Sequence, residues 1–343
     1  MKERFLHLLA CPTCRSALRI ASRDERDGET IVTGALVCTG CEESYPIRST
    51  IPRFVTNAHE TSFARQWAEF HRVQRDSYNG TTWVRDLIAR RTGWSPDHLR
   101  MKTVIECGCG SGNDTEVLVE QAGTLVSFDY SSAVDYVPAE IRAKPNFLLV
   151  QGDMAAIPAA RDAFDVVYCH RAIQHTPDPA ASFEQLASCV APGGEMFLHC
   201  YDTHPRSRLQ SKYLYRPLTK RLPYEVVRRF VMLAGPVMIP LVKKLQALGP
   251  LGYLPRAVIP FVNMDREIAP GSKLTPQERY ALSVLVTIDA LTPAHDHPQS
   301  PGTLRAWFEA KGFERIELRG RNPVLMLAHR PATDDRRAAT PGT

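Results

Sequence analysis

Residues 104–112 read VIECGCGSG, a short apolar run followed by Glu106 and a loop that interleaves two cysteines with three glycines. The next residues, NDTEVLVEQAG, carry apolar side chains at helical spacing and end at Gly123. We therefore expect a strand, a glycine loop and a helix in that order. Nucleotide-binding α/β domains begin in this way. The remaining question is whether Cys107 and Cys109 or the glycines carry the chemistry of the loop.

Four further apolar segments predict strands that alternate with helices such as 180–190. The segments are TLVSFDY, NFLLVQGDM, FDVVYCH and, after the turn APGG, GEMFLHCY. The first has Asp129 among its last residues, the second ends at Asp153, and the third ends near Cys169 and His170. Alternating strands and helices of this kind predict an α/β fold, a parallel sheet with helices on both faces.

The glycine spacing distinguishes between cofactors. Dinucleotide sites use GxGxxG, whereas this chain has GxGxG from Gly108, just after the acidic Glu106. Together with the acidic residues that end the next two strands and the run FDVVYCHRAIQHTPDP, this pattern resembles the class I S-adenosylmethionine-dependent methyltransferases, particularly their type 11 small-molecule branch. The resemblance covers about 100–200 and resumes at 303–330, where TLRAWFEAKGF predicts a helix and ERIELRGRNPVLMLAHR the antiparallel hairpin that ends this Rossmann-like fold.

The resemblance implies a role for each matching residue. Glu106 would orient the methionine amine of S-adenosylmethionine through the loop, and Asp129 would hold the ribose. Asp153 and Met154 would hold the edge and face of the adenine. The other cofactor-binding positions are Gly108, Gly110, Gly112 and Cys169. The two cysteines of the loop are then small fillers, since alternate residues in such a loop offer no second pair of metal ligands.

Histidines at strand ends are the candidates for a catalytic base. Methyl transfer from a sulfonium mainly requires alignment, and a base is needed where the acceptor must lose a proton. His170 and His199 are our catalytic candidates, because ligands of open α/β sheets bind at the carboxyl ends of strands. A strand-end histidine can equally be a hydrogen-bonded structural group. His175 is expected to be structural, because the resembling family keeps such a histidine across unrelated substrates; His295 and His297 are more distant candidates.

Two CxxC pairs at the N terminus predict a metal site. Cys11 with Cys14 and Cys38 with Cys41 can supply the four thiolates of a closed tetrahedral zinc site. The residues between the pairs predict two strands around a charged turn. A redox role is the alternative, but thioredoxin-like motifs lie in a βαβ context. The ending YPIRSTIPRF resembles the small zinc-ribbon family that activates tRNA and protein methyltransferases, which implies structural zinc in residues 1–55.

Residues 56–100 predict a helical connection. One apolar helix face comprises Phe63, Trp67 and Phe70. Thr61 or Ser62 could cap the N terminus of this helix. The apolar face either packs on the next domain or covers the cofactor pocket as a lid.

Residues 202–300 form an insertion, for which we expect a mainly helical cap over the substrate. Residues 205–256 contain eleven Lys or Arg against the single acid Glu225, a local charge of +10, whereas the whole chain carries +5. Within this segment the apolar run FVMLAGPVMIPLV, which glycine and two prolines interrupt, is too short to span a bilayer but suits a pocket wall or a contact with a membrane surface. The charge favours an anionic acceptor; a helical cap with snorkelling basic residues is the alternative.

Composition places the chain among folded, water-soluble proteins, with 44% hydrophobic and 23% charged residues. The first residues show no export signal, so we expect a cytoplasmic protein that contacts anionic membranes peripherally, and cysteines used for metal binding or burial. We divide the chain into a zinc ribbon (1–55), a helical linker or lid (56–100), the methyltransferase domain (101–201 and 301–330), the helical insertion (202–300) and a disordered tail (331–343).

Two functions fit these features. The first is an S-adenosylmethionine-dependent methyltransferase acting on a small or lipid-linked, anionic metabolite. The second is an rRNA or tRNA methyltransferase, because a zinc ribbon before a methyltransferase also resembles bacterial rRNA guanine methyltransferases and a basic insertion could follow phosphates. The metabolite is favoured over nucleic acid, because the basic segment lacks aromatic platforms for bases and CHRA replaces the Asn-Pro-Pro-Tyr type of motif. The sequence indicates no oligomeric state.

Overall fold

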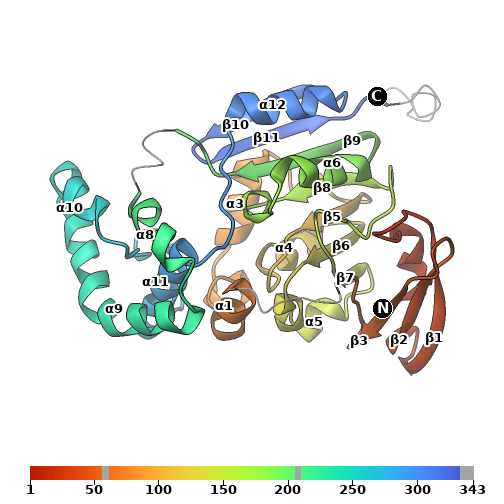
Figure 1. The fold of residues 1–343 in the computed structure, drawn as a ribbon, viewed down its shortest axis with the longest axis horizontal. Helices are drawn as coiled ribbons and strands as arrows, with labels where there is room; N and C mark the ends of the chain where they lie inside the picture. Colours follow the sequence, from red (N-terminus) through yellow and green to blue (C-terminus); the bar gives the residue numbers. More distant parts are fainter. Residues whose placement is uncertain (56–61, 205–209, 333–343) are drawn as a thin grey trace.

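The computed structural model describes residues 1–55, 62–204 and 210–332. Within these ranges the chain forms a four-stranded sheet, a seven-stranded sheet and a group of helices (Figure 1). The expected cap Thr61, the side chain of Ser62, the cations Arg206 and Arg208 and the residues 333–343 of the expected disordered tail lie outside the described residues.

The N-terminal ribbon is a small antiparallel sheet. Its elements are η1 (Glu3–Leu8), β1 (Leu18–Asp27), β2 (Thr30–Cys38), β3 (Ser44–Arg48) and β4 (Ile51–Pro52), with the strands in the order of the chain. The turn between β1 and β2 contains Gly28 at a φ of 54°, a left-handed conformation that glycine adopts without strain. The predicted pair of strands around a charged turn is therefore confirmed.

The larger sheet contains seven strands in the described part of the chain. In spatial order they are β10 (Glu314–Arg321), β11 (Val324–His329), β9 (Val190–Cys200), β8 (Phe164–Cys169), β5 (Thr103–Cys107), β6 (Thr124–Asp129) and β7 (Phe147–Gln151). Neighbours from β9 to β7 pair in parallel, and β11 pairs antiparallel with both β9 and β10. This confirms the predicted Rossmann-like sheet with a C-terminal hairpin. Since β6 and β8 flank β5 on opposite sides, the carboxyl ends of β5 and β8 form a switch point where ligands of such sheets bind.

Helices cover both faces of this sheet. They are α3 (Trp83–Thr92), α4 (Asn113–Gln121), α5 (Ala139–Arg142), α6 (Pro179–Cys189) and α12 (Pro301–Ala310). Side chains of α6 and α12 share one buried cluster with the ribbon, and those of α3, α4 and α5 form a second cluster. The two clusters lie on opposite faces because alternate residues of each strand point to opposite sides of the sheet.

Two predicted boundaries were wrong. Strand β7 ends at Gln151 rather than Asp153, because Asp153 begins a tight turn in which the Ala156 N–H donates to its carbonyl at 3.2 Å. The expected turn APGG lies inside β9 instead of before it. The pairing of β8 with β9 shifts register there, and Gly193 at a φ of 81° lets these residues bulge out of the ladder.

The ribbon docks on the edge of the larger sheet. Arg53 forms a parallel bridge with Gln151 of β7, and the Phe54 N–H donates to the carbonyl of Gln151 at 2.8 Å. Leu9 forms a second bridge, with Ala159. Apolar side chains of the ribbon and of the sheet also join one buried cluster. The ribbon thus covers a sheet edge whose backbone groups would otherwise lack partners.

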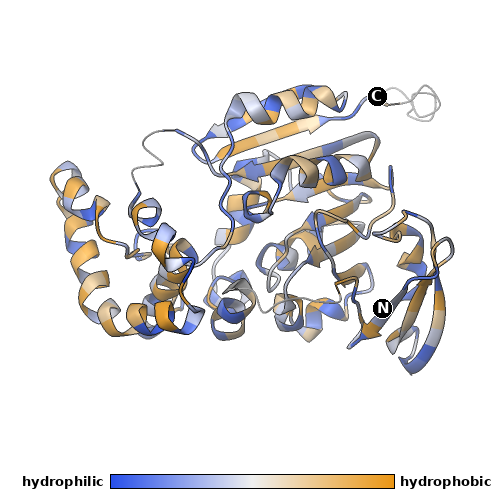
Figure 2. Cartoon of the chain, viewed as in Figure 1, coloured by the Kyte–Doolittle hydropathy of each residue, from blue (hydrophilic) through white to orange (hydrophobic). Residues whose placement is uncertain are grey.

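The insertion is helical, as predicted, and lies at the opposite end of the molecule from the ribbon (Figure 1). Its elements are α8 (Ser211–Thr219), α9 (Tyr224–Ala247), η4 (Gly249–Gly252), α10 (Tyr253–Ala257) and α11 (Pro276–Leu291); before the large sheet come α1 (Ser62–Phe70) and α2 (Asp76–Asn79). Side chains of α1, α9 and α11 form a third buried cluster. Figure 2 shows α9 as mostly apolar along its length.

Helix α9 continues through the two prolines of the apolar run. Pro236 and Pro240 both lie inside α9, on its exposed side. A proline within a helix removes one backbone hydrogen bond. On the exposed side water can solvate the carbonyl group that loses its donor, so the helix continues. None of the helices in the described ranges combines the length and the hydropathy that crossing a bilayer requires.

Candidate active site and metal centre

The glycine loop joins β5 to α4 at the switch point. Gly108, Gly110 and Gly112 have φ values of 81°, 55° and 90°. These values lie in the left-handed region that favours glycine. A Cβ atom on Gly108 would also lie 2.3 Å from the Cβ of Ala172, which follows β8. Both the backbone and the close approach of the two loops therefore require the glycines.

Glu106 is buried directly below the loop. Its Oε2 accepts hydrogen bonds from the hydroxyl of Thr115, at 2.7 Å, and from that of Ser127, at 2.6 Å. Burial, and then the charge of Asp114, raise the pKa of Glu106 to about 8. A cation close to the loop would stabilise the ionised form of this carboxyl group. The geometry is thus compatible with the role expected for Glu106 beside a ligand amine.

Asp129 ties the end of β6 to the glycine loop. Its Oδ2 accepts from the N–H of Gly110 at 2.9 Å, and its Oδ1 accepts from the N–H and the hydroxyl of Ser131 at 2.8 and 2.7 Å. Burial raises the pKa of Asp129. Because a carboxylate has about four acceptor positions, one remains for a ligand hydroxyl.

The other expected cofactor residues lie at the same edge. The N–H of Gly152 bonds the carbonyl of Asp129, which brings Asp153 to the end of β6. Met154 is buried, with its Cε 3.0 Å from the position of a Cβ on Gly108. Cys169 is buried at the end of β8, opposite Cys107 in the ladder. The structure therefore brings these residues together, while their contacts with a cofactor stay predictions.

Helix α1 and the residues after it lie over the loop. The indole nitrogen of Trp67 is 3.1 Å from the position of a Cβ on Gly110. Arg75 is buried and donates to the carbonyls of Ser111 and Tyr136, both at 2.8 Å. Helix α1 also packs on the insertion, where Gln66 and Thr292 are hydrogen-bonded. Helix α1 thus both packs on another part of the protein and lies over the glycine loop, and its action as a lid stays a prediction.

His170, the first catalytic candidate, is held from both sides. Its Nδ1–H donates to Asp114 of α4 at 2.5 Å, and its Nε2 accepts from Arg91 of α3. The hydroxyl of Tyr168 donates to the same carboxylate at 2.9 Å. Burial lowers the pKa of His170 to about 4. In this arrangement neither ring nitrogen is free to accept a proton from an acceptor.

His199, the second candidate, lies beside it with one ring nitrogen available. Its Nδ1 accepts from the backbone N–H of Arg171 at 3.1 Å, while its Nε2 forms no hydrogen bond within the described ranges. The centroids of the His170 and His199 rings are 5.0 Å apart. Burial lowers the pKa of His199 well below its usual value, so the ring is neutral at pH 7. Because Nδ1 is the acceptor, the hydrogen of this neutral ring is on Nε2, which can donate a hydrogen bond to a ligand but cannot take up a proton.

Arg171 and two cations of α8 form a polar cluster beneath the insertion. Arg171 has a φ of 60°, an uncommon conformation for a residue other than glycine. The Lys212 ammonium lies 4.2 Å from the ring centroid of Tyr201, just beyond β9, and 3.8 Å from Asp296. Arg216 is buried, pairs with Asp296 and donates to a backbone carbonyl of α11. Burial, and then Arg216, lower the pKa of Lys212 to about 7.

The other candidate histidines border this cluster. His175 and the backbone carbonyl of His295 are hydrogen-bonded at 3.0 Å, and the His175 ring meets that of Tyr201 edge-on. His295 stacks on His297. These contacts connect the loop after β8 with the end of the insertion.

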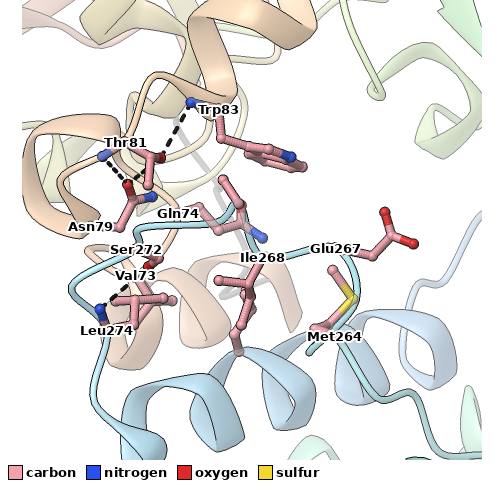
Figure 3. A pocket seen from close by; sticks show the side chains of 12 residues that line it. Val73, Gln74, Asn79, Thr81, Trp83, Met264, Glu267, Ile268, Ser272 and Leu274 are labelled. Carbon is pink, nitrogen blue, oxygen red and sulfur yellow. Dashed lines mark hydrogen bonds between the residues drawn. The ribbon is translucent and has the colours of Figure 1, made fainter.

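A small cavity lies between the α2–α3 segment and the insertion (Figure 3). Gln74 and Trp83 line one side and Met264, Glu267 and Ile268 the other. Its volume is about 30 Å³, room for about one water molecule. It does not accommodate an acceptor in this form.

The four N-terminal cysteines form one cluster. Their sulfur atoms all lie within 4.8 Å of one another, with Cys11 and Cys41 3.7 Å apart and Cys14 and Cys38 3.3 Å apart. Tetrahedral zinc with Zn–S bonds of about 2.3 Å places sulfurs about 3.8 Å apart. The hydroxyl of Tyr45 and two backbone N–H groups of the second knuckle also point at these sulfurs, as thiolates require. The donor set therefore fits structural zinc.

Sequence reasoning missed several residues of the site. They are Arg75, Arg91, Asp114, Lys212 and Arg216. Asp114 carried a weak signal, as an acidic residue in the first turn of the helix after the glycine loop. The others lie in segments that contain further Arg or Lys residues, such as Arg72, Arg90 and Lys220, so no pattern distinguishes the buried cations.

Comparison with known families agrees with these two sites. Residues 105–198 match the family model described as a methyltransferase domain, and residues 2–49 match the model described as Trm112p-like protein. The chain thus joins a Trm112p-like ribbon to a methyltransferase domain. Its sheet is that of S-adenosylmethionine-dependent methyltransferases.

The curated relatives are similar over part of their length. A ubiquinone biosynthesis O-methyltransferase of Stutzerimonas stutzeri is 28% identical over 129 residues, which are 36% of this chain and 56% of the relative. Its counterpart in Azotobacter vinelandii is 26% identical over 148 residues, 41% of this chain and 62% of the relative. The chain thus spans little more than half the length of these relatives. A chain from a complex that contains the Haloferax volcanii Trm112 methyltransferase activator is 20% identical, with a TM-score of 0.35, covering 41% of this chain and 61% of that one.

Proposed function

We propose that the protein is a methyltransferase that binds S-adenosylmethionine at the carboxyl ends of β5, β6 and β8. The observation that carries this proposal is the Asp129 carboxylate, which holds Gly110 and Ser131 and keeps an acceptor position toward the site. Glu106 lies below the same loop with a raised pKa and would be stabilised by the cationic ligand. S-adenosylmethionine supplies an activated methyl group, and the protein aligns the acceptor with it.

We place the acceptor beneath the insertion, beside Arg171, Lys212 and Tyr201. Two buried or half-buried cations of α8 and the strained Arg171 meet there at the ends of β8 and β9. Positive charge and aromatic surface together suit a small or lipid-linked acceptor with an anionic group. The names of the curated relatives favour an oxygen atom as the methyl acceptor.

His199 is the proposed contact to the acceptor. Its Nε2–H would donate a hydrogen bond to the acceptor oxygen and align that oxygen with the methyl group; as the new O–C bond forms and the C–S bond of the methyl donor breaks, the hydroxyl proton leaves to water. The backbone N–H of Arg171 holds Nδ1 in its acceptor state, which orients the ring. His170, held by Asp114 and Arg91, is the proposed positioning residue, because it packs edge-on against His199.

The basic insertion supports the nucleic-acid alternative less strongly than its net charge of +10 suggests. Lys212 and Arg216 face Asp296, Arg228 is held by Glu69 and Lys243 pairs with Asp265. Cations that already have carboxylate partners contribute less to binding phosphates.

Incubation of a cell extract with the protein and methyl-labelled cofactor tests the proposal. We expect label in a small-molecule or lipid fraction, and at least about tenfold slower transfer for His199→Phe with cofactor binding retained, because the acceptor loses a hydrogen bond. Asp97→Ala, a substitution at an exposed carboxylate, is the matched control for surface charge. Label found in RNA would favour the alternative, and equal rates for His199→Phe would remove the proposed contact.

A further inference from the structure

Helix α9 is apolar on two faces. One face packs into the third buried cluster through Val227, Val231 and Ile239, against α11. The second face is exposed and comprises Val226, Phe230, Leu233, Val237, Leu241 and, at the end of the helix, Leu248. We call this second set the outer stripe. Its members are three, four or seven positions apart, so they lie on one side of the helix.

The outer stripe is unusual for a protein surface. Leu233 is 82% exposed and Val237 66% exposed, and the stripe continues past α9 to Leu251 and Leu254, which are 84% and 78% exposed. Single exposed apolar residues need no explanation, but a continuous row of this length marks an interaction surface.

Positive charge borders the outer stripe. Arg229 follows Val226 by three positions and Lys244 follows Leu241 by three, so both lie beside the stripe. Within the described ranges Lys220, Arg221, Arg229 and Lys244 are exposed and form no ion pair, unlike Arg228 and Lys243. Between residues 211 and 258 the sequence contains the single acid Glu225.

We propose that the outer stripe docks on the surface of an anionic lipid bilayer, with α9 lying in the interface. A long helix with exposed apolar side chains, flanking cations and almost no acids has the chemistry that such surfaces bind. The prolines at the exposed side of α9 leave carbonyl groups that the hydrated interface can solvate. This inference does not depend on the proposed methyl transfer, because it concerns a face of the insertion with its own residues.

Vesicle flotation tests the proposal with the full chain. The probes are vesicles of phosphatidylcholine alone and vesicles that also contain phosphatidylglycerol, at low and high salt. We expect retention on the anionic vesicles at low salt and weaker retention at high salt. Leu233→Ser with Val237→Ser should reduce the partition coefficient by roughly tenfold or more. Arg229→Ser with Lys244→Ser should reduce it by roughly fivefold for each cation and remove the preference for anionic lipid.

Control variants distinguish binding through the outer stripe from non-specific adsorption to vesicles. Met101→Ser removes an apolar side chain that is 87% exposed elsewhere, and Arg100→Ser removes an exposed cation; both variants should bind as the unaltered chain does. Unchanged thermal unfolding would show that the stripe variants fold. Equal retention on neutral and anionic vesicles, unaltered binding by the stripe variants, binding to RNA in place of vesicles, or a dimer that the Leu233 and Val237 substitutions dissociate would each overturn the proposal.

Discussion

The ribbon and the insertion are two additions to the same sheet, and they differ in how much of their apolar surface is buried within the chain. The ribbon pairs its backbone with β7 and shares a buried cluster with the sheet. The insertion buries one side of α9 but leaves the outer stripe exposed, and it meets the end of the sheet through polar contacts such as that of the Lys212 ammonium with the Tyr201 ring just beyond β9. The ribbon interface is therefore complete within the chain, whereas the insertion has a second face suited to something outside it.

The largest expected effect is loss of the metal from the ribbon. Cys11→Ser should abolish tight zinc binding and unfold the ribbon, because structural zinc contributes several kcal/mol or more to small domains. Since the ribbon shares a buried cluster with the sheet, we expect the thermal unfolding of the whole protein to shift to lower temperature. Metal analysis and calorimetry measure both effects. A ribbon that stays folded without zinc, or a chelated protein that zinc does not restore, would contradict the assignment.

A buried ion pair should matter more to the insertion than an exposed one. Arg216→Met would leave the buried Asp296 carboxylate with only the Lys212 ammonium, 3.8 Å away, and should cost about 3 kcal/mol of unfolding free energy. The matched variant Arg228→Met breaks the half-exposed pair with Glu69 and should cost less than about 1 kcal/mol. Denaturant unfolding compares them. Equal costs would show that burial does not set the strength of these contacts.

Burial of Glu106 below the glycine loop should make the stability of the protein depend on pH. The pKa of Glu106 is raised to about 8 in the folded protein, so the folded state retains a proton that the unfolded state loses above its ordinary pKa of 4.5. Stability from this group is therefore full below about pH 4.5 and falls as the pH rises toward 8. Glu106→Gln should remove a few kcal/mol of this fall, at about 1.4 kcal/mol per pKa unit. Identical pH profiles for the two proteins would contradict the burial of an uncompensated carboxyl group.

Local patterns predicted the parts of the fold that depend on neighbouring residues. The CxxC spacing identified all four cysteines of the cluster, and the apolar runs identified the strands of the larger sheet. The bulge in β9 depends on its pairing with β8, and the end of β7 depends on a turn at Asp153 that the apolar run does not indicate, so both predictions failed. The sequence also does not reveal that one helix contains both Pro236 and Pro240, because tolerance of proline depends on which side of the helix is exposed.

The residues of the candidate site also fall into those that local sequence patterns predicted and those that depend on distant parts of the chain. Glu106 and Asp129 follow strands and could be predicted from the glycine motif beside them. The contacts of His170 could not, because Asp114 and Arg91 reach it from two helices that are far apart in the sequence. Burial of Lys212 and Arg216 depends on how α8 packs against α11, which the charge of the segment does not reveal.

The most direct test of the account is the affinity for S-adenosylmethionine, measured by calorimetry for the unaltered chain, Asp129→Ala and the exposed control Asp97→Ala. We predict that the unaltered chain and the control bind equally well. Asp129→Ala should bind more weakly by about 1 to 3 kcal/mol, because a ribose hydroxyl and the N–H of Gly110 lose their acceptor. Unchanged affinity in Asp129→Ala, or a preference for a nicotinamide dinucleotide, would contradict the assignment of the cofactor site.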